Sequence, residues 1–389
     1  MNKISIDNLP ENAYINAPVY LDEKYILLSP DIPVSSDMVK RLRDWGYTHV
    51  LSSGALSEAP PAGLSQAPEN GSQTGMMESN LKEAEEQKKT SELFEEYTAY
   101  MDNLFARFRE KNELRLNDIS DKLKEIQADL KTYRRFMLGM ISVKNESGSY
   151  NASHSVKTTI LALAIGEVLK LAHHKLIDLG LAALLHRVGM MRIPEAVYLK
   201  EGALTPQEKK TIIAHPVLGF RILKESGFPM SVAVAVLEQN EKLDGSGYPR
   251  GITAEKISYF GRILTVASNY CAAVSQRPYK NELDGHSGIV DLLKGNGTQY
   301  DEHVLRGLVF VMSVYPMGTF VLLSNNARGL VIKTDLQNPK YPTLRLLTNE
   351  KGIPYAEKPI FQTGEKEEIK IVRSLNKEES EELKEYLRS

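Results

Sequence analysis

Cysteine and tryptophan are nearly absent from this 389-residue chain, which contains one of each. The single cysteine, Cys271, cannot form a disulfide within the chain, so the sequence indicates a protein of a reducing, cytoplasmic compartment. Neither sign of charge is in excess, with 48 basic against 50 acidic residues, which argues against general binding to nucleic acid or to an anionic membrane. No apolar run approaches the about 20 residues that cross a bilayer, and the first residues lack the apolar core of a signal peptide.

Length and hydrophobic content, 42% of residues, predict two or three domains. Residues 1–52 mix short apolar runs with a helical pattern near residues 35–51, which predicts a small α+β module. Residues 53–77 are rich in Ser, Gly, Ala, Pro and Gln. They contain too few large apolar side chains to form a core, so we expect a flexible linker there.

Residues 78–145 contain no proline and no glycine before Gly139, which predicts a long helical region. Its apolar residues recur at alternating intervals of three and four, as in a coiled-coil seam, with a break expected near Lys111 and Asn112. Two readings remain open: an intermolecular coiled coil, which would make the protein a homodimer, or an amphipathic helix packed on its own domain. The spaced residues are Phe94, Tyr97, Met101, Leu104 and Phe108, followed by Leu116, Ile119, Leu123, Ile126, Leu130, Tyr133 and Met137.

The rest of the chain predicts a helical domain over residues 146–312 and a β extension with a terminal helix over residues 313–389. Helical periodicity is clear in the first part, and the run Thr205-Pro206-Gln207-Glu208 is typical of a helix start. In the second part, short β-type runs such as "GTFVLLS", "GLVIKTD" and "PTLRLLTN" are separated by turn residues. The charged run "NKEESEELKEYLRS" then predicts a closing helix.

Three motifs in the helical part carry information about function. They are "ALLHRVGMMRIP" (183–194), "AHPVLGFRIL" (214–223) and "EKLDGSGYP" (241–249). Together they strongly resemble the HD-GYP family, whose members with complete motifs hydrolyse cyclic di-GMP at a di- or trinuclear metal centre. The resemblance implies a mainly α fold, with an HD-type helical bundle behind a small α+β module and a long helix.

The resemblance also implies that most of the family's metal ligands are missing. Three histidines match the family pattern: His154, His186 and His215. At carboxylate positions the chain has Tyr150, Arg187, Ser268 and Cys271, while Met190 replaces a lysine and Gln239 and Asn240 replace paired histidines that precede Glu241.

Arg187 is the most damaging of these changes, because it inverts the charge where the family has a bridging aspartate. A guanidinium about 4 Å from a divalent ion would repel it by several kcal/mol, even at an effective dielectric constant near 20. We therefore expect no cofactor. One divalent ion (zinc, manganese or iron) on His154, His186 and His215 is the alternative left open.

The retained features predict binding. Arg187, Tyr248, Arg277 and Lys280 are the residues we expect to contact a cyclic dinucleotide. The loop tip Gly247, Tyr248 and Pro249 is a candidate contact for a diguanylate cyclase (GGDEF) domain or another signalling protein. The sequence thus predicts a catalytically degenerate HD-GYP protein that is a cyclic di-GMP receptor or a scaffold, with an active phosphodiesterase as the alternative.

Overall fold

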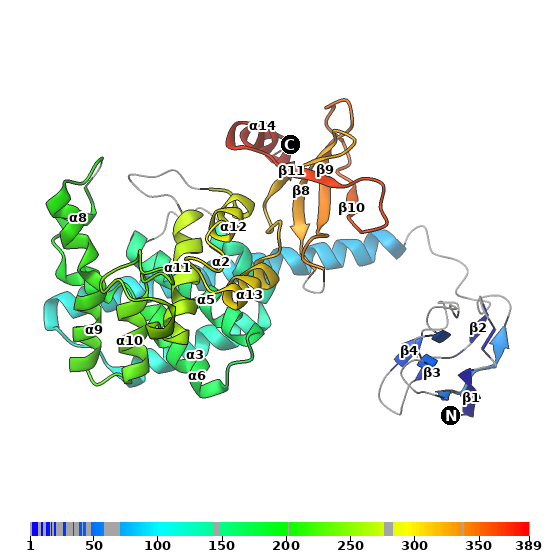
Figure 1. The fold of residues 1–389 in the computed structure, drawn as a ribbon. Coiled ribbons are helices and arrows are strands. Elements are labelled where there is room, and N and C mark those ends of the chain that lie inside the picture. Colours follow the sequence, from blue (N-terminus) through cyan, green and yellow to red (C-terminus); the bar gives the residue numbers. More distant parts are fainter. Residues whose placement is uncertain are drawn as a thin grey trace. The chain divides into compact units, whose positions relative to one another are not determined.

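The computed structural model describes residues 2–6, 9–10, 13–15, 17, 19–20, 26–28, 34, 39–40, 42–43, 48–57, 71–142, 148–200, 202–275, 283–335 and 338–388. The chain divides into two compact units, Met1–Glu85 and Glu86–Ser389 (Figure 1). Among the described residues, no helix is both long enough and apolar enough to cross a membrane.

The N-terminal unit contains a four-stranded antiparallel sheet of order β1-β5-β3-β4. Its buried side chains, Val34, Leu42 and Val50 among them, form a separate small core. Helical residues are described at 39–40 and 42–43. The strands are β1(Asn2–Ser5), β3(Val19–Tyr20), β4(Ile26–Leu28) and β5(His49–Ser52), with a two-stranded pair β2(Tyr14–Ile15) and β6(Leu56–Ser57).

Two predictions need correction in this part of the chain. The helical pattern was expected to reach residue 51, but residues 49–52 form β5, because their burial alternates and they pair with two neighbouring strands. The predicted linker 53–77 includes β6 and the first turns of the helix α2(Gly71–Lys111). A long helix propagates into residues of weak propensity once its later turns are formed.

The long helical region breaks where the sequence predicted. Helix α2 ends at Lys111, Asn112 takes a positive φ of 57°, and the next helix is α3(Leu116–Thr132). The short α4(Arg134–Gly139) and η2(Met140–Ser142) follow. Most of the spaced apolar residues are buried in the core of the chain's own helical domain, and Leu116 and Tyr133 pack half-buried against it. This burial supports an amphipathic helix packed on its own domain, and the intermolecular coiled coil stays a prediction.

The helical domain is built around α5, which is buried along almost its whole length. It packs against α6, α11 and α13. Helix α8 begins with a complete capping box between Thr205 and Glu208, as its sequence predicts. The remaining elements are α5(Tyr150–Val168), α6(His173–Leu185), η3(Val188–Arg192), α7(Glu195–Tyr198), α8(Pro206–Ile213), α9(His215–Glu225), α10(Met230–Glu238), η4(Ala254–Lys256), α11(Tyr259–Ala273), α12(Gly285–Leu293) and α13(Glu302–Met312).

The C-terminal part is a five-stranded antiparallel sheet of order β10-β9-β8-β7-β11. Neighbouring β7 residues point to opposite faces: Val321 joins one small core, and Phe320 packs with Leu383 of α14 in another. The fold is thus mainly α with a C-terminal sheet, as predicted. The elements are β7(Phe320–Leu323), β8(Arg328–Lys333), β9(Thr343–Thr348), β10(Ile360–Gln362), β11(Ile371–Ser374) and α14(Lys377–Arg388).

Candidate functional site

The three motif histidines come from three different helix ends or first turns and are all buried. His154 lies on the first turns of α5, His186 follows the last residue of α6, and His215 begins α9. The rings of His154 and His186 are in edge contact, with centroids 5.1 Å apart. Sequence reasoning named these residues, and the fold of the helical domain places them around one region.

Backbone carbonyls orient two of the imidazoles. Nδ1 of His186 donates to the carbonyl of Ala183 at 2.7 Å, and Nδ1 of His215 donates to Ile212 at 2.8 Å. Because a carbonyl only accepts, Nδ1 carries the proton and Nε2 carries the lone pair. Neither Nε2 has a hydrogen-bond partner among the described residues. Each ring therefore presents a buried acceptor atom.

Both of these imidazoles are neutral at physiological pH. Burial, and after it the positive charge of Arg187, lower the pKa of His186 to about 3. The same two causes, in the same order, lower the pKa of His215 to about 3, and the nearby Gln239 side chain opposes them in part without reaching hydrogen-bond geometry at Nε2. His154 differs from them, because its Nε2 lies 3.2 Å from the Ser268 hydroxyl.

Arg187 lies at the centre of this group. Its Nε and Nη2 donate to Asn151 Oδ1 at 3.1 and 3.0 Å, and its guanidinium lies 5.9 Å from the ring centroid of Tyr150. Tyr150 in turn stacks on His154 with centroids 5.3 Å apart. Asn151 is a neutral acceptor, so this hydrogen bond does not cancel the positive charge.

A cavity of about 700 Å³ opens in front of these residues. Seven of the positions where the resemblance implies a departure from the family or a retained histidine line it: Tyr150, His154, Arg187, Met190, His215, Asn240 and Ser268. These positions from separate motifs are therefore walls of one cavity, whereas His186, Gln239 and Cys271 are not among its lining residues. Gly247 and Tyr248 line it as well.

Two further cations line the cavity that sequence reasoning missed, Arg109 of α2 and Lys242. Arg109 is ion-paired with Glu195 and donates to the Tyr198 hydroxyl, while Lys242 donates to Gln299 at 2.9 Å. Lys242 lies within the motif of residues 241–249, and its position was a usable signal. Arg109 lies outside every motif, and nothing in its local sequence points to the cavity.

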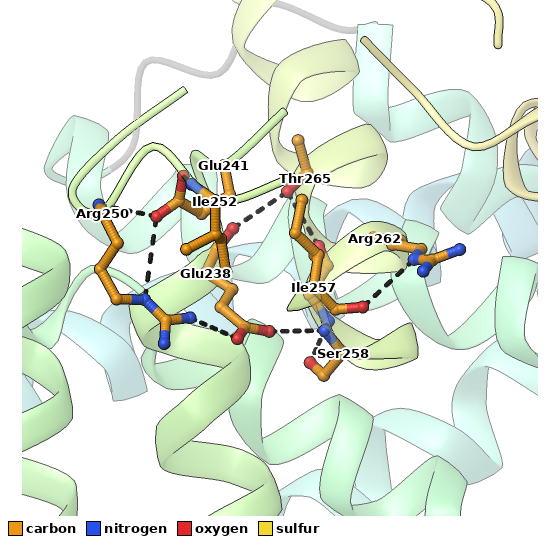
Figure 2. A network of polar contacts seen from close by, with 9 residues as sticks. Glu238, Glu241, Arg250, Ile252, Ile257, Ser258, Arg262 and Thr265 are labelled. Carbon is orange, nitrogen blue, oxygen red and sulfur yellow. Dashed lines mark hydrogen bonds and ion pairs between the residues drawn. The ribbon is translucent and has the colours of Figure 1, made fainter. Parts of the chain in front are cut away.

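Glu241, which the resemblance implies is retained, and Glu238 accept hydrogen bonds from the backbone around the loop. The Glu241 carboxylate accepts from the backbone N–H groups of Arg250 at 2.8 Å and Ile252 at 3.2 Å, as Figure 2 shows. Glu238 accepts from the Ser258 backbone at 2.8 Å and pairs with the Arg250 guanidinium. Both carboxylates are buried, and this network uses their acceptor capacity. Sequence reasoning missed the role of Glu238.

The loop Asp244–Pro249 is held closely against this network. Gly245 has a positive φ of 77°, and a side chain at Gly247 would come within 2.5 Å of the Asn240 carbonyl. The Tyr248 backbone donates to that carbonyl at 3.0 Å. The loop is thus a tight turn that also brings Gly247 and Tyr248 to the cavity, while Pro249 follows half-buried.

Three predicted features of the site remain predictions: the ligand contacts of Arg277 and of Lys280, and a single divalent ion on the three motif histidines. Arg277 and Lys280 lie outside the described residues. Among the described residues, no group of three or more His, Cys, Asp or Glu side chains is arranged to hold a metal ion. Because Arg187 occupies the centre of the group and the buried glutamates are engaged elsewhere, the donor set does not fit a dinuclear centre.

Comparisons with known proteins indicate the family of the helical domain. A family model described as "HD domain" matches residues 136–304. The chain is 32% identical over 239 residues to cyclic di-GMP phosphodiesterase PdeB of Borreliella burgdorferi, covering 61% of this chain and 63% of that protein. It is 33% identical over 215 residues to cyclic di-GMP phosphodiesterase PA4108 of Pseudomonas aeruginosa, covering 55% and 51%.

Among solved structures, Bd1817, an HDG"Y"P protein from Bdellovibrio bacteriovorus, aligns with a TM-score of 0.44 and 15% identity, covering 79% of this chain and 97% of that one. The chain spans between half and two thirds of the length of the two curated relatives. Residues 136–304 thus match the HD domain family, and the chain is similar to two cyclic di-GMP phosphodiesterases.

Proposed function

We propose that this chain binds a cyclic dinucleotide, cyclic di-GMP first, in the cavity in front of Arg187, and that it does not hydrolyse it. It would then act in bacterial second-messenger signalling as a receptor or as a partner-binding scaffold. The observation that carries the proposal is the guanidinium of Arg187 in the cavity wall, at the position where the family resemblance implies a bridging aspartate.

The cavity suits a dianionic ligand. Its volume lies within the about 300 to 1,000 Å³ that is usual for small-molecule sites. A cyclic dinucleotide carries two phosphodiester charges. Arg187, Arg109 and Lys242 line the cavity together with two carboxylates, Asp102 and Glu195, of which Glu195 is ion-paired with Arg109. Guanidinium groups bind phosphate through paired, charge-assisted hydrogen bonds. Tyr150 and Tyr248 also line it, and aromatic rings of this kind stack on nucleobases.

Hydrolysis needs a water that is activated by a metal ion or by a general base. The buried glutamates nearest the motif, Glu238 and Glu241, accept hydrogen bonds from backbone N–H groups. The buried imidazoles of His186 and His215 have lowered pKa values and stay neutral. A fixed cation in place of metal ions supports phosphate binding without supplying a nucleophile.

The alternative is an active phosphodiesterase with an atypical site, and two observations favour it. The relatives above are named cyclic di-GMP phosphodiesterases. The Nε2 atoms of His186 and His215 are buried acceptors without hydrogen-bond partners among the described residues, and neutral imidazole nitrogens are common ligands of zinc, manganese and iron. With His154 they are the set that the sequence predicts for one such ion, although the three side chains are not arranged to hold a metal ion in this structure.

Calorimetry with cyclic di-GMP in the presence of EDTA tests the receptor proposal. We expect binding without metal, and a loss of about tenfold or more in affinity for Arg187→Ala, because a hydrogen bond to a charged group contributes about 1.5–3 kcal/mol. Arg221→Ala is the matched control, since Arg221 is exposed on α9 away from the residues that line the cavity. No heat at high ligand concentration would reject the receptor and leave the scaffold.

A second assay separates the receptor from the enzyme. Metal content is measured on the purified protein, and cyclic di-GMP is incubated with it in the presence of manganese or iron while linear product is followed by mass spectrometry. The receptor predicts intact ligand. Turnover that disappears in His186→Ala would overturn the proposal and establish the alternative.

Partner binding and dimerisation belong to the same proposal. The half-buried tip Gly247, Tyr248 and Pro249 would contact a GGDEF domain or another signalling protein. Capture of a purified GGDEF domain by the wild type but not by Tyr248→Ala supports the scaffold. Light scattering of the purified chain measures the homodimer, whose interface would lie outside the seam residues buried in the core.

A further inference from the structure

A second pocket lies where the helical domain meets the C-terminal sheet, away from the first cavity. Its volume is about 270 Å³. Its walls are apolar: Leu138 and Gly139 at the end of α4, Val311 and Met312 at the end of α13, and Met317 in the connection to β7. None of these residues lines the cavity at Arg187.

Three cationic residues border this pocket. Arg134, Arg135 and Lys333 line it mainly with their hydrocarbon stems, and no acidic side chain is among its lining residues. Arg134 is ion-paired with Glu167, and Arg135 donates to the carbonyl of Ile332 at 2.9 Å. Lys333 is exposed at the end of β8 and has no ion-pair partner among the residues that the structure describes.

Apolar walls with a positive rim are complementary to one class of small molecule, a single hydrocarbon chain that ends in an anion. A nucleobase or sugar would fit poorly, because its polar edges would be buried against Leu138, Val311 and Met312 without hydrogen-bond partners. A hydrocarbon chain gains free energy from the same walls. Methionine side chains adapt to such chains more readily than branched ones.

We propose that this pocket binds a medium-chain fatty acid, with the hydrocarbon chain between α4 and α13 and the carboxylate at Lys333. The bound chain would contact both the helical domain and the strand β8. Because a ligand stabilises the form that binds it, occupancy would strengthen the docking of the sheet on the helices. This inference is independent of the dinucleotide proposal.

Displacement of a fluorescent fatty-acid probe from the purified full-length chain tests the proposal, with competitors below their micellar concentrations. The competitors share one chain length and differ in the head group: decanoate, decanol and decyltrimethylammonium. Lys333→Gln removes the expected carboxylate contact, and Lys351→Gln is a matched control on an exposed lysine of the same sheet region. Gly139→Leu fills the pocket, because a Cβ at Gly139 meets only Met317 Cε, at 3.7 Å.

We expect decanoate to bind about fivefold more tightly than decanol, and decyltrimethylammonium to bind most weakly. Lys333→Gln should weaken decanoate binding about threefold, as for the loss of an exposed ion pair. Gly139→Leu should abolish displacement by decanoate while the melting temperature stays at or above that of the wild type. Arg187→Ala should leave decanoate binding unchanged. Equal displacement by all three head groups, or full binding by Gly139→Leu, would overturn the proposal.

Discussion

Gly189 in η3 is the residue where a single methyl group should disturb the candidate site most. A Cβ at this position would clash with the carbonyl oxygen of His215 and lie 2.7 Å from the backbone nitrogen of Gly219. Both neighbours are backbone atoms of α9, so neither can rotate away. Gly189→Ala must therefore push η3 away from α9, and with it Arg187 away from His215.

The loss in free energy of unfolding that we expect for Gly189→Ala follows from this geometry. Overpacking of a core costs about 1–3 kcal/mol when side chains can adjust, and here only backbone can move, so we expect about 3 kcal/mol. For a domain of this size, that lowers the melting temperature by about 5 to 10 °C. Differential scanning calorimetry measures the shift, and urea unfolding monitored by circular dichroism checks it at equilibrium.

Gly139→Ala is the matched control for this experiment. Its added Cβ meets only Met317 Cε, at the ordinary contact distance of 3.7 Å, and alanine is the better helix former. We expect an unchanged or slightly raised melting temperature. If Gly189→Ala unfolds at the temperature of the wild type and of Gly139→Ala, the close packing of η3 on α9 is refuted, and with it the fixed position of Arg187.

Three further predictions concern other parts of the chain. The Cys271 thiol is buried, and burial raises its pKa to about 12. A thiol reagent at pH 8 should therefore label it only after the protein is unfolded in guanidinium. Rapid labelling of the native protein would contradict its burial. Asp102 accepts hydrogen bonds from the backbone N–H and the hydroxyl of Ser149, the residue that caps α5. Asp102→Ala should therefore lower the free energy of unfolding in urea by about 1–2 kcal/mol. The exposed control Asp121→Ala should change it by less than about 0.5 kcal/mol. The Arg373 guanidinium, and after it the backbone N–H of Asn376 at the start of α14, lower the pKa of Glu379 from 4.5 to about 2. The contribution of ionised Glu379 to the free energy of unfolding is therefore present above pH 4.5 and is lost as the pH falls toward 2. Glu379→Gln should flatten that part of the stability profile, and an unchanged profile would contradict the ion pair.

Local sequence patterns predicted many elements correctly. The helix start at Thr205, the break after Lys111 and the C-terminal strands are all present. Each depends on residues close in the chain, such as a side-chain cap, a positive φ or an alternating pattern. The strand β5 was missed, because its pairing with β1 and β3 is a long-range contact that overrides local helical periodicity.

The candidate site was predictable only in part. Arg187 and His215 were named because they fall within recognisable motifs, and the structure brings both to one cavity. Arg109 was missed because α2 contributes it from outside every motif. The apolar spacing of α2 and α3 was equally compatible with a partner helix and with the chain's own core, since both require the same apolar stripe.

The sequence by itself determined the resemblance to the HD-GYP family, the helical domain with its C-terminal strands, and, as an implication of that resemblance, Tyr150, Arg187 and Ser268 at positions where carboxylates are expected. Motif residues and local periodicity carry that information along the chain. The tertiary structure alone decided that these three residues share one cavity, that Glu238 and Glu241 hold backbone N–H groups, and that most of the helical seam is buried in the chain's own domain. The reason is that cavities, ion pairs and burial arise from residues distant in sequence, whose packing no local pattern encodes.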